Sequence, residues 1–61
     1  MEKELVRELE RLTERFISEG RRLRELDDCE GALRKFELAS KAITLINLVK
    51  MAKRILEEGA E

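Results

Sequence analysis

Apolar residues in the first half of this chain recur at alternating steps of four and three, which is the spacing of one face of an α-helix. Large apolar side chains fill all but one of these positions, the exception being Glu19: Leu5, Leu9, Leu12, Phe16, Leu23 and Leu26. Most residues between them are charged, and pairs such as Glu8–Arg11 and Arg15–Glu19 have the separation at which opposite charges meet on a helix surface. The spacing predicts a helix over about residues 2–26, with one apolar face.

The helical pattern breaks at two consecutive aspartates, residues 27 and 28, where we expect a turn. Asp27 is followed three residues later by Glu30, a spacing typical of a capping box, in which both side chains bond to backbone N–H groups of the first helical turn. We therefore expect Asp27 to be the N-cap of a second helix over about residues 28–58. Two helices joined by so short a turn lie antiparallel.

The second predicted helix carries two apolar stripes whose centres lie roughly 130° apart on a helical wheel. The first stripe comprises Cys29, Ala32, Phe36, Ala39, Ile43 and Ile46. The second stripe comprises Leu38, Ala42, Leu45, Val49, Ala52 and Leu56. A helix that is apolar on most sides is buried on most sides, and the one face of the first helix covers only one stripe. We expect the first stripe to pack on the first helix and the second stripe to form an interface with another chain.

The short turn also predicts a register between the two helices. It brings Leu26 opposite Cys29, so that Cys29 is a small core residue beside the turn. The same register brings Phe36 close to Glu19 and Gly20. A large side chain then faces a residue without a side chain, which lets facing core positions fill the available space.

The length and the cysteine and histidine content limit how such a hairpin is stabilised. The chain has 61 residues, one cysteine and no histidine, which excludes an internal disulfide and a Cys/His metal site. A chain this short usually needs a disulfide, a metal or a partner subunit, which leaves the partner subunit. We therefore expect an all-α fold, an antiparallel two-helix hairpin that dimerises into a four-helix bundle, with no cofactor.

The composition also disfavours catalysis and nucleic-acid binding. Without histidine, general acid–base chemistry at neutral pH has no ordinary donor, and no base is predicted beside Cys29, so we expect no enzyme activity. The net charge is −1, whereas nucleic-acid binders usually have a basic excess. Two basic patches are the candidate nucleic-acid contacts: Arg21, Arg22, Arg24, Lys50, Lys53 and Arg54. Favourable charge at a helix end is the simpler interpretation of these patches.

The sequence also predicts a compartment. Its longest uncharged run is residues 42–49, whereas a membrane-spanning helix needs about 20 apolar residues. Residues 2–4 are charged and no apolar segment follows them, so we expect no signal peptide. A lone cysteine fits a reducing compartment, and we expect a cytoplasmic protein. Many charged residues with no glutamine and a single asparagine suggest a thermophilic source.

Part of the predicted hairpin resembles one tetratricopeptide repeat. The residues that carry the resemblance are Gly20, Leu23, Asp28, Ala32, Phe36 and Ala39. Asp27 stands where that family has a turn glycine, Cys29 stands where it has an aromatic residue, and no second repeat follows. The layout is also similar to hairpin proteins that dimerise into four-helix bundles, such as the plasmid copy-number RNA-binding protein and the small subunit of bacterial exonuclease seven. These resemblances imply a role in helix-mediated binding.

Three functions follow from these features. The first is a non-enzymatic interaction module that self-associates through the second helix as a homodimer. The second is a small accessory subunit whose uncovered stripe binds a helix of a larger enzyme or regulator. The third is a nucleic-acid-binding hairpin that uses the basic patches. An apolar stripe alone does not specify whose helix it meets, so the first two share one predicted surface.

Overall fold

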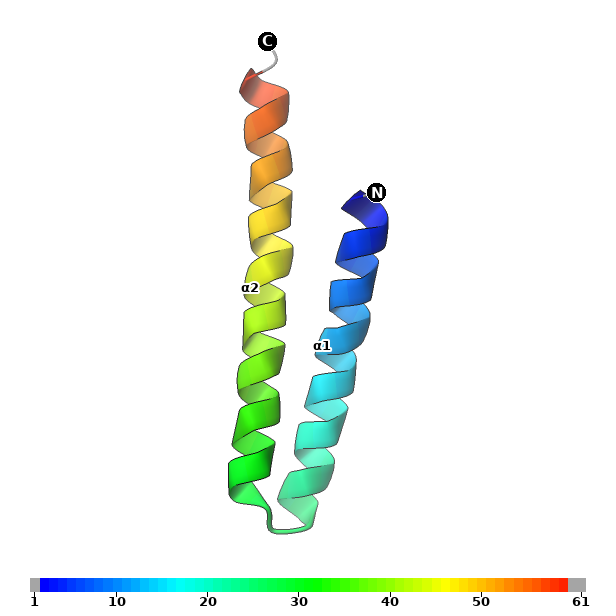
Figure 1. Cartoon of the computed structure of the whole chain (residues 1–61), viewed down its shortest axis with the longest axis vertical. Coiled ribbons are helices and arrows are strands. Elements are labelled where there is room, and N and C mark those ends of the chain that lie inside the picture. The colour runs from blue at the N-terminus through cyan, green and yellow to red at the C-terminus, as the bar shows by residue number, and fades with distance from the viewer. Residues whose placement is uncertain (1, 60–61) are drawn as a thin grey trace.

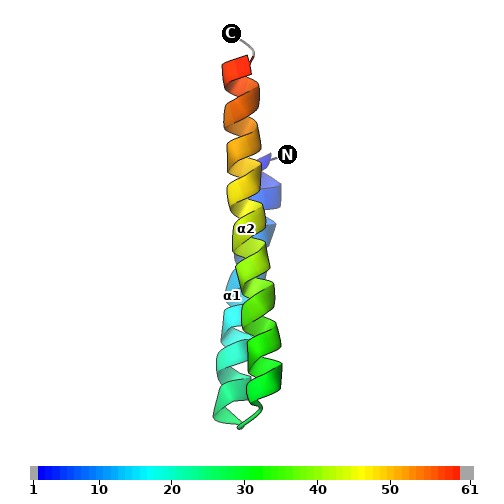
Figure 2. The same ribbon diagram turned by 90° about the vertical axis from the view of Figure 1, so that its left-hand side faces the viewer.

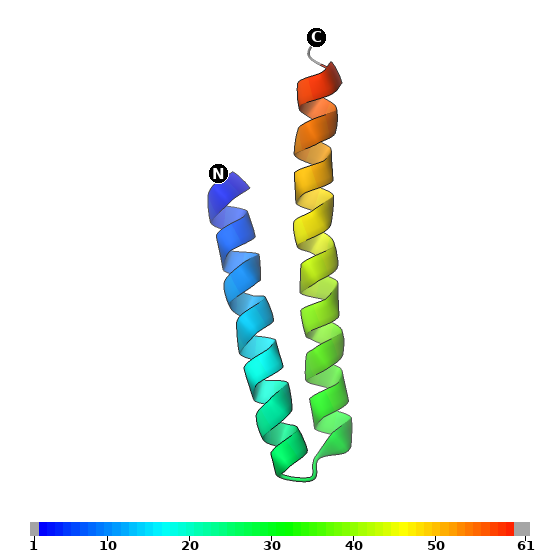
Figure 3. The same ribbon diagram turned by 180° about the vertical axis from the view of Figure 1, so that it is seen from behind.

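The chain forms two long helices that pack side by side in opposite directions (Figure 1). The computed structural model describes residues 2–59, in which α1 spans Glu2–Glu25 and α2 spans Cys29–Gly59. The predicted all-α hairpin is therefore confirmed, and each helix end lies within one residue of its predicted position. Seen from behind, the helices are closest near the turn and separate toward the N-terminus of α1 (Figure 3).

The turn between the helices is a Schellman motif, which satisfies the last carbonyl groups of α1. The backbone N–H of Asp28 donates to the carbonyl oxygen of Leu23 at 2.9 Å, and that of Asp27 donates to Arg24 at 3.0 Å. Asp27 takes the left-handed conformation that this motif requires, with φ at 62°. Glycine is the usual residue at such a position because a side chain is unfavourable there. Asp27 therefore ends α1.

The N-cap of α2 is Asp28, so the predicted cap at Asp27 is wrong. The side chain of Asp28 accepts a hydrogen bond from the backbone N–H of Gly31 at 2.9 Å, and its carbonyl oxygen accepts one from Ala32 at 3.0 Å. Glu30 falls one position too early to complete a capping box with this cap. The prediction failed because it assigned to Asp27 the role of its neighbour, while Asp27 is used to end the preceding helix.

The surface of α2 that packs against α1 lies between the two predicted stripes and includes residues of both. The buried residues of α2 are Ala32, Ala39, Ala42 and Ile46. Ala42 belongs to the stripe that was expected to face outward, whereas Cys29 and Ile43, from the stripe expected to face α1, are exposed. The core assignments of Cys29 and Ile43 are therefore wrong.

The contact lies where it does because small residues let the two backbones approach. On α1 the buried residues are Thr13 and Gly20, one position after the predicted apolar row, and Leu5 and Leu12 of that row are exposed. The hydroxyl of Thr13 donates to the carbonyl oxygen of Leu9 at 2.7 Å, so its burial leaves no hydroxyl group unsatisfied. The α1 face is thus rotated by about one residue from the predicted one.

Gly20 makes room for Phe36 of α2, as the register predicted. A Cβ atom built on Gly20 would lie 2.7 Å from Cε1 of the Phe36 ring, closer than such atoms pack. Both phenylalanines are half-buried at the sides of the contact. Within residues 3–59 no large side chain is fully buried, so the hairpin has only a thin core, made mostly of small residues together with Ile46.

The hairpin is long and narrow (Figure 2). Its extents are 53 × 17 × 9 Å and its radius of gyration is 15.0 Å. A compact domain of this length would have a radius of gyration of about 10.5 Å. Because α2 has 31 residues and α1 has 24, the C-terminal end of α2 extends beyond α1 (Figure 1).

We expect opposite effects from substitutions at the two turn aspartates. Asp28→Ala removes the cap and should lower the free energy of unfolding by about 1 kcal/mol. Asp27→Gly relieves the left-handed conformation and should raise it by about 0.5–1 kcal/mol. Urea denaturation followed by circular dichroism measures both. A loss of stability in Asp27→Gly would contradict the assignment of that residue to the end of α1.

Gly20→Ala should destabilise the hairpin although alanine is the better helix former. In an exposed helix this change would add about 1 kcal/mol of stability. Here the new methyl group meets the Phe36 ring, and overpacking of this kind costs about 1–3 kcal/mol. The melting temperature should fall, and Phe36→Leu in the same chain should restore part of it. A rise in the single variant would show that the ring moves away freely.

Candidate interaction surface

An ion pair between the helices shows which sides of α1 and α2 lie together. Nζ of Lys35 lies 3.2 Å from Oε1 of Glu19, an oxygen that is shielded from solvent. The same ammonium stands 5.6 Å from the centre of the Phe16 ring. Leu5 and Leu12 are fourteen and seven residues before Glu19, which places them on the same side of α1.

On α2 the corresponding side carries a second row of apolar residues. Leu38 and Leu45 stand three and ten residues after Lys35, and so lie on the side of the hairpin that holds Glu19, Leu5 and Leu12. We call this surface the leucine face, and it comprises Leu5, Leu12, Leu38, Leu45, Leu48, Ala52 and Ile55. Every one of these residues is exposed, with the large side chains between 36% and 64% accessible.

The leucine face differs from the predicted interface in part. Leu38, Leu45, Ala52 and Leu56 are exposed as that prediction requires, but Ala42 is buried and Val49 is half-buried. The two inner residues lie toward α1 and contribute to the hairpin instead.

Sequence reasoning missed Leu48 and Ile55, which are 53% and 64% exposed. The signal that could have found them is the heptad spacing on the outer side of Leu45. Four further exposed large apolar residues of α2 lie off the leucine face: Leu33, Ile43, Met51 and Leu56. Leu56 lies in the end of α2 that extends past α1, which explains its 70% exposure.

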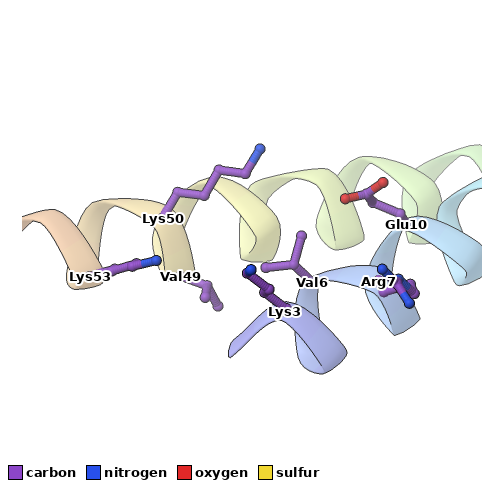
Figure 4. A pocket seen from close by; sticks show the side chains of 7 residues that line it. All are labelled: Lys3, Val6, Arg7, Glu10, Val49, Lys50 and Lys53. Carbon is purple, nitrogen blue, oxygen red and sulfur yellow. The ribbon is translucent and has the colours of Figure 1, made fainter. Parts of the chain in front are cut away.

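Two basic residues of α2, Lys50 and Lys53, border a cleft at the open end of the hairpin (Figure 4). The cleft has a volume of about 380 Å³ and is lined by Lys3, Val6, Arg7, Glu10, Val49, Lys50 and Lys53. Figure 4 shows Lys3 and Val6 projecting from α1 into the space beside α2. Two of the predicted nucleic-acid contacts, Lys50 and Lys53, therefore share one cleft with two basic residues of α1.

The other basic patch lies toward the opposite end of the hairpin. Arg21 and Arg22 border a shallow groove on α1 together with Glu14 and Glu25, so acidic and basic groups line this groove in equal number. Arg24, in the last turn of α1, and Arg54 of α2 are exposed. At 1.5 Å per residue the two patches lie about 28 Å apart along the helix axis, and they form no continuous basic surface.

Cys29 is a free, exposed cysteine in the first turn of α2. Among the described side chains, no three cysteine, aspartate or glutamate residues are grouped as metal ligands would be.

Neither helix, over residues 2–59, contains a stretch long and apolar enough to cross a bilayer.

Two ion pairs on the surface of α1 form as the sequence predicts. The predicted pairs Glu8–Arg11 and Arg15–Glu19 are confirmed, with N–O distances of 3.2 and 3.6 Å. Contact with the Lys35 ammonium holds the pKa of Glu19 below its usual value of 4.5, partial desolvation opposes this shift, and Arg15 adds to it. Glu19 thus joins a pair within α1 to a pair between the helices.

We expect Glu19 to make the hairpin sensitive to acid. Its pKa is lower in the folded chain than in the unfolded one, so its contribution to stability is complete above the usual glutamate pKa and is lost as the pH falls through the lowered value. Glu19→Gln should therefore lower the denaturation midpoint at neutral pH, and its difference from the wild type should shrink below pH 4.5. Glu8→Gln, which removes an exposed pair, is the matched control. Equal effects of the two substitutions at every pH would contradict the role of Lys35.

No family model matches the chain, and no curated protein or solved structure is significantly similar to it.

Proposed function

We propose that this chain is a non-enzymatic interaction module that self-associates through the leucine face as a homodimer, forming a four-helix bundle. The observation that carries this proposal is the surface area that the single hairpin leaves in water. The chain exposes 5353 Å². A compact monomer of the same mass, 7.1 kDa, would expose about 4,100 Å².

The excess area is of the size that a partner covers. It amounts to roughly 1,300 Å² for each chain, and a stable protein–protein interface of standard size buries about 800 Å² on each partner. Soluble monomers rarely expose contiguous apolar patches larger than a few hundred Å². The leucine face extends over most of the length of α2 and includes part of α1, so it offers one surface of adequate size.

The thin core supports the same conclusion. Its buried residues include three alanines and one isoleucine, and each large aliphatic side chain that is fully buried contributes roughly 1.5–3 kcal/mol. Small domains retain a net stability of only about 5–15 kcal/mol after chain entropy is offset. Burying the leucines of two copies against each other adds the apolar contacts that the hairpin does not make by itself.

A second copy is preferred to a different partner because the surface suits pairing with itself. The leucine face consists of aliphatic side chains together with Ala52 on two adjacent helices, and the chain as a whole is nearly neutral. Two like copies can therefore meet without a large charge repulsion. The tetratricopeptide-like pattern stays a prediction, and it implies the same helix-mediated binding. A heteromeric accessory subunit is the alternative that a monomeric chain would favour.

The decisive experiment combines light scattering with substitutions on and off the leucine face. The wild type should be a dimer whose melting temperature rises with protein concentration. Leu45→Glu with Leu48→Glu should dissociate it, because two charges per copy would be buried in the interface.

The matched control is Leu33→Glu with Ile43→Glu, which changes two side chains of comparable exposure off the leucine face and should leave the dimer intact. A monomeric wild type, or a dimer lost only in the control, would refute the proposal.

A further inference from the structure

The leucine face has a spacing that selects one way of seating a second copy, and the inference rests on the self-association proposed above. On α2 its residues follow steps of three and four, with Lys41 completing the row: Leu38, Lys41, Leu45, Leu48, Ala52 and Ile55. This is the spacing of the apolar seam in a coiled coil, on a side of α2 that α1 does not cover. A helix laid along this row would contact every one of these residues.

Lys41 determines the direction of the second helix. In a parallel pair with a two-fold axis along the helices, each seam residue faces its own copy, so Lys41 would face the partner's Lys41 inside an apolar seam. Two like charges removed from water repel strongly, and single charged residues in such seams set the orientation of coiled coils. In an antiparallel pair each seam residue faces a different one, which separates the two ammonium groups.

We propose that two copies pair α2 with α2 in the antiparallel direction, about a two-fold axis that passes between Leu45 and Leu48. Leu45 then packs on the partner's Leu48, and Leu38 packs on the partner's Ile55. All four contacts that the two-fold axis generates from these residues are between large aliphatic side chains. Ile55, which lies beyond the end of α1, is covered in this arrangement by the partner.

The register follows from the same row. In the proposed register Lys41 crosses the partner's Ala52, whose small side chain lets the lysine stem lie over it while the ammonium group reaches water. A shift of seven residues in one direction places Lys41 on the partner's Leu45 and Arg34 on the partner's Ala52. A shift in the other direction leaves Leu38 beyond the end of the partner's α2. Of these three registers, only the proposed one pairs every large aliphatic residue of the row with another and places Lys41 on an alanine.

α1 supports this axis independently, because its residues played no part in choosing it. Val6 and Val49 border the same cleft, so the two helices are opposed there, and a point between Leu45 and Leu48 lies level with Leu9. Leu9 is almost midway between Leu5 and Leu12. The two-fold axis therefore brings Leu5 level with the partner's Leu12 along the helix axis. One axis thus relates apolar residues of both helices at matching heights.

Among the described residues that flank the α2 seam, one pair of like charges comes together. Glu37 comes near the partner's Glu58 at the edge of the seam. Both glutamates are exposed, and charge interactions between solvated groups of this kind amount to little because water and salt screen them. The repulsion is therefore small beside the burial of the seam.

Disulfide cross-linking between two single-cysteine variants tests the direction and the register together. Leu38→Cys and Ile55→Cys are made in a Cys29→Ser chain, because the exposed Cys29 thiol would otherwise react. Light scattering first verifies that each variant is a dimer. The two variants are then mixed so that their subunits exchange, and the mixture is oxidised with copper phenanthroline. Disulfide-linked dimers should form in the mixture and not in either variant alone, since the two copies of residue 38 stand about 26 Å apart along the axis.

Each outcome bears on the inference. Cross-linking within Leu38→Cys alone would indicate parallel helices, and a dimer whose mixture stays unlinked would indicate another register; either result overturns the inference and leaves self-association standing. A monomeric wild type overturns both. If the seam variants dissociate, Glu37→Cys and Glu58→Cys, joined by a short bismaleimide, test the same geometry from the solvated edge. Linkage only in their mixture supports the inference, and its absence contradicts it.

Discussion

Close approach of the two backbones, permitted by small residues on both helices, determines what the rest of the hairpin presents to its surroundings. Thr13 and Gly20 on α1 pack against a surface of α2 that is rich in alanine. This narrow contact runs along the centre of the interface between the two helices. Ile46 is the one large aliphatic residue of α2 that is buried in this contact, and most other large apolar side chains lie at its sides or outside it. The exposed apolar surface is therefore a direct result of the way the interior is packed.

Most charged side chains, like most of the large apolar ones, lie outside the contact between the helices. Along α1 they form pairs within one helix, which leave the contact surface free of charge, while Lys35 extends across to Glu19 and covers the Phe16 ring. Toward the open end the side chains between the helices become basic and the two ribbons separate. The two helices thus pack most closely near the turn, and the residues between them become more polar toward the open end.

The sequence was sufficient to predict both helices, their direction, their limits and the contact between Gly20 and Phe36, because helical periodicity and a short turn leave few alternatives. It was not sufficient to place the contact surface on each helix, since rows one position apart, such as Leu12 and Thr13, satisfy the same periodicity. Side-chain size decided between them. The turn was misjudged for a similar reason: two adjacent aspartates can each serve as a cap, and only the backbone conformation of Asp27 distinguishes them. Periodicity alone does not assign Leu48 and Ile55 to the interface, because the position of the inner contact determines which row of α2 faces outward.

The end of α2 that extends past α1 has a dynamic consequence. Over residues 2–59, its last turns have no neighbouring helix, and an isolated helical segment of that length is marginal in water. In a separate hairpin its amide hydrogens would exchange with solvent at rates close to those of an unfolded peptide, whereas the amides around Ala39 would be protected by global stability. Protection of the amides at this end thus indicates that another chain packs against it. Hydrogen exchange can therefore follow assembly of the hairpin residue by residue, without any substitution.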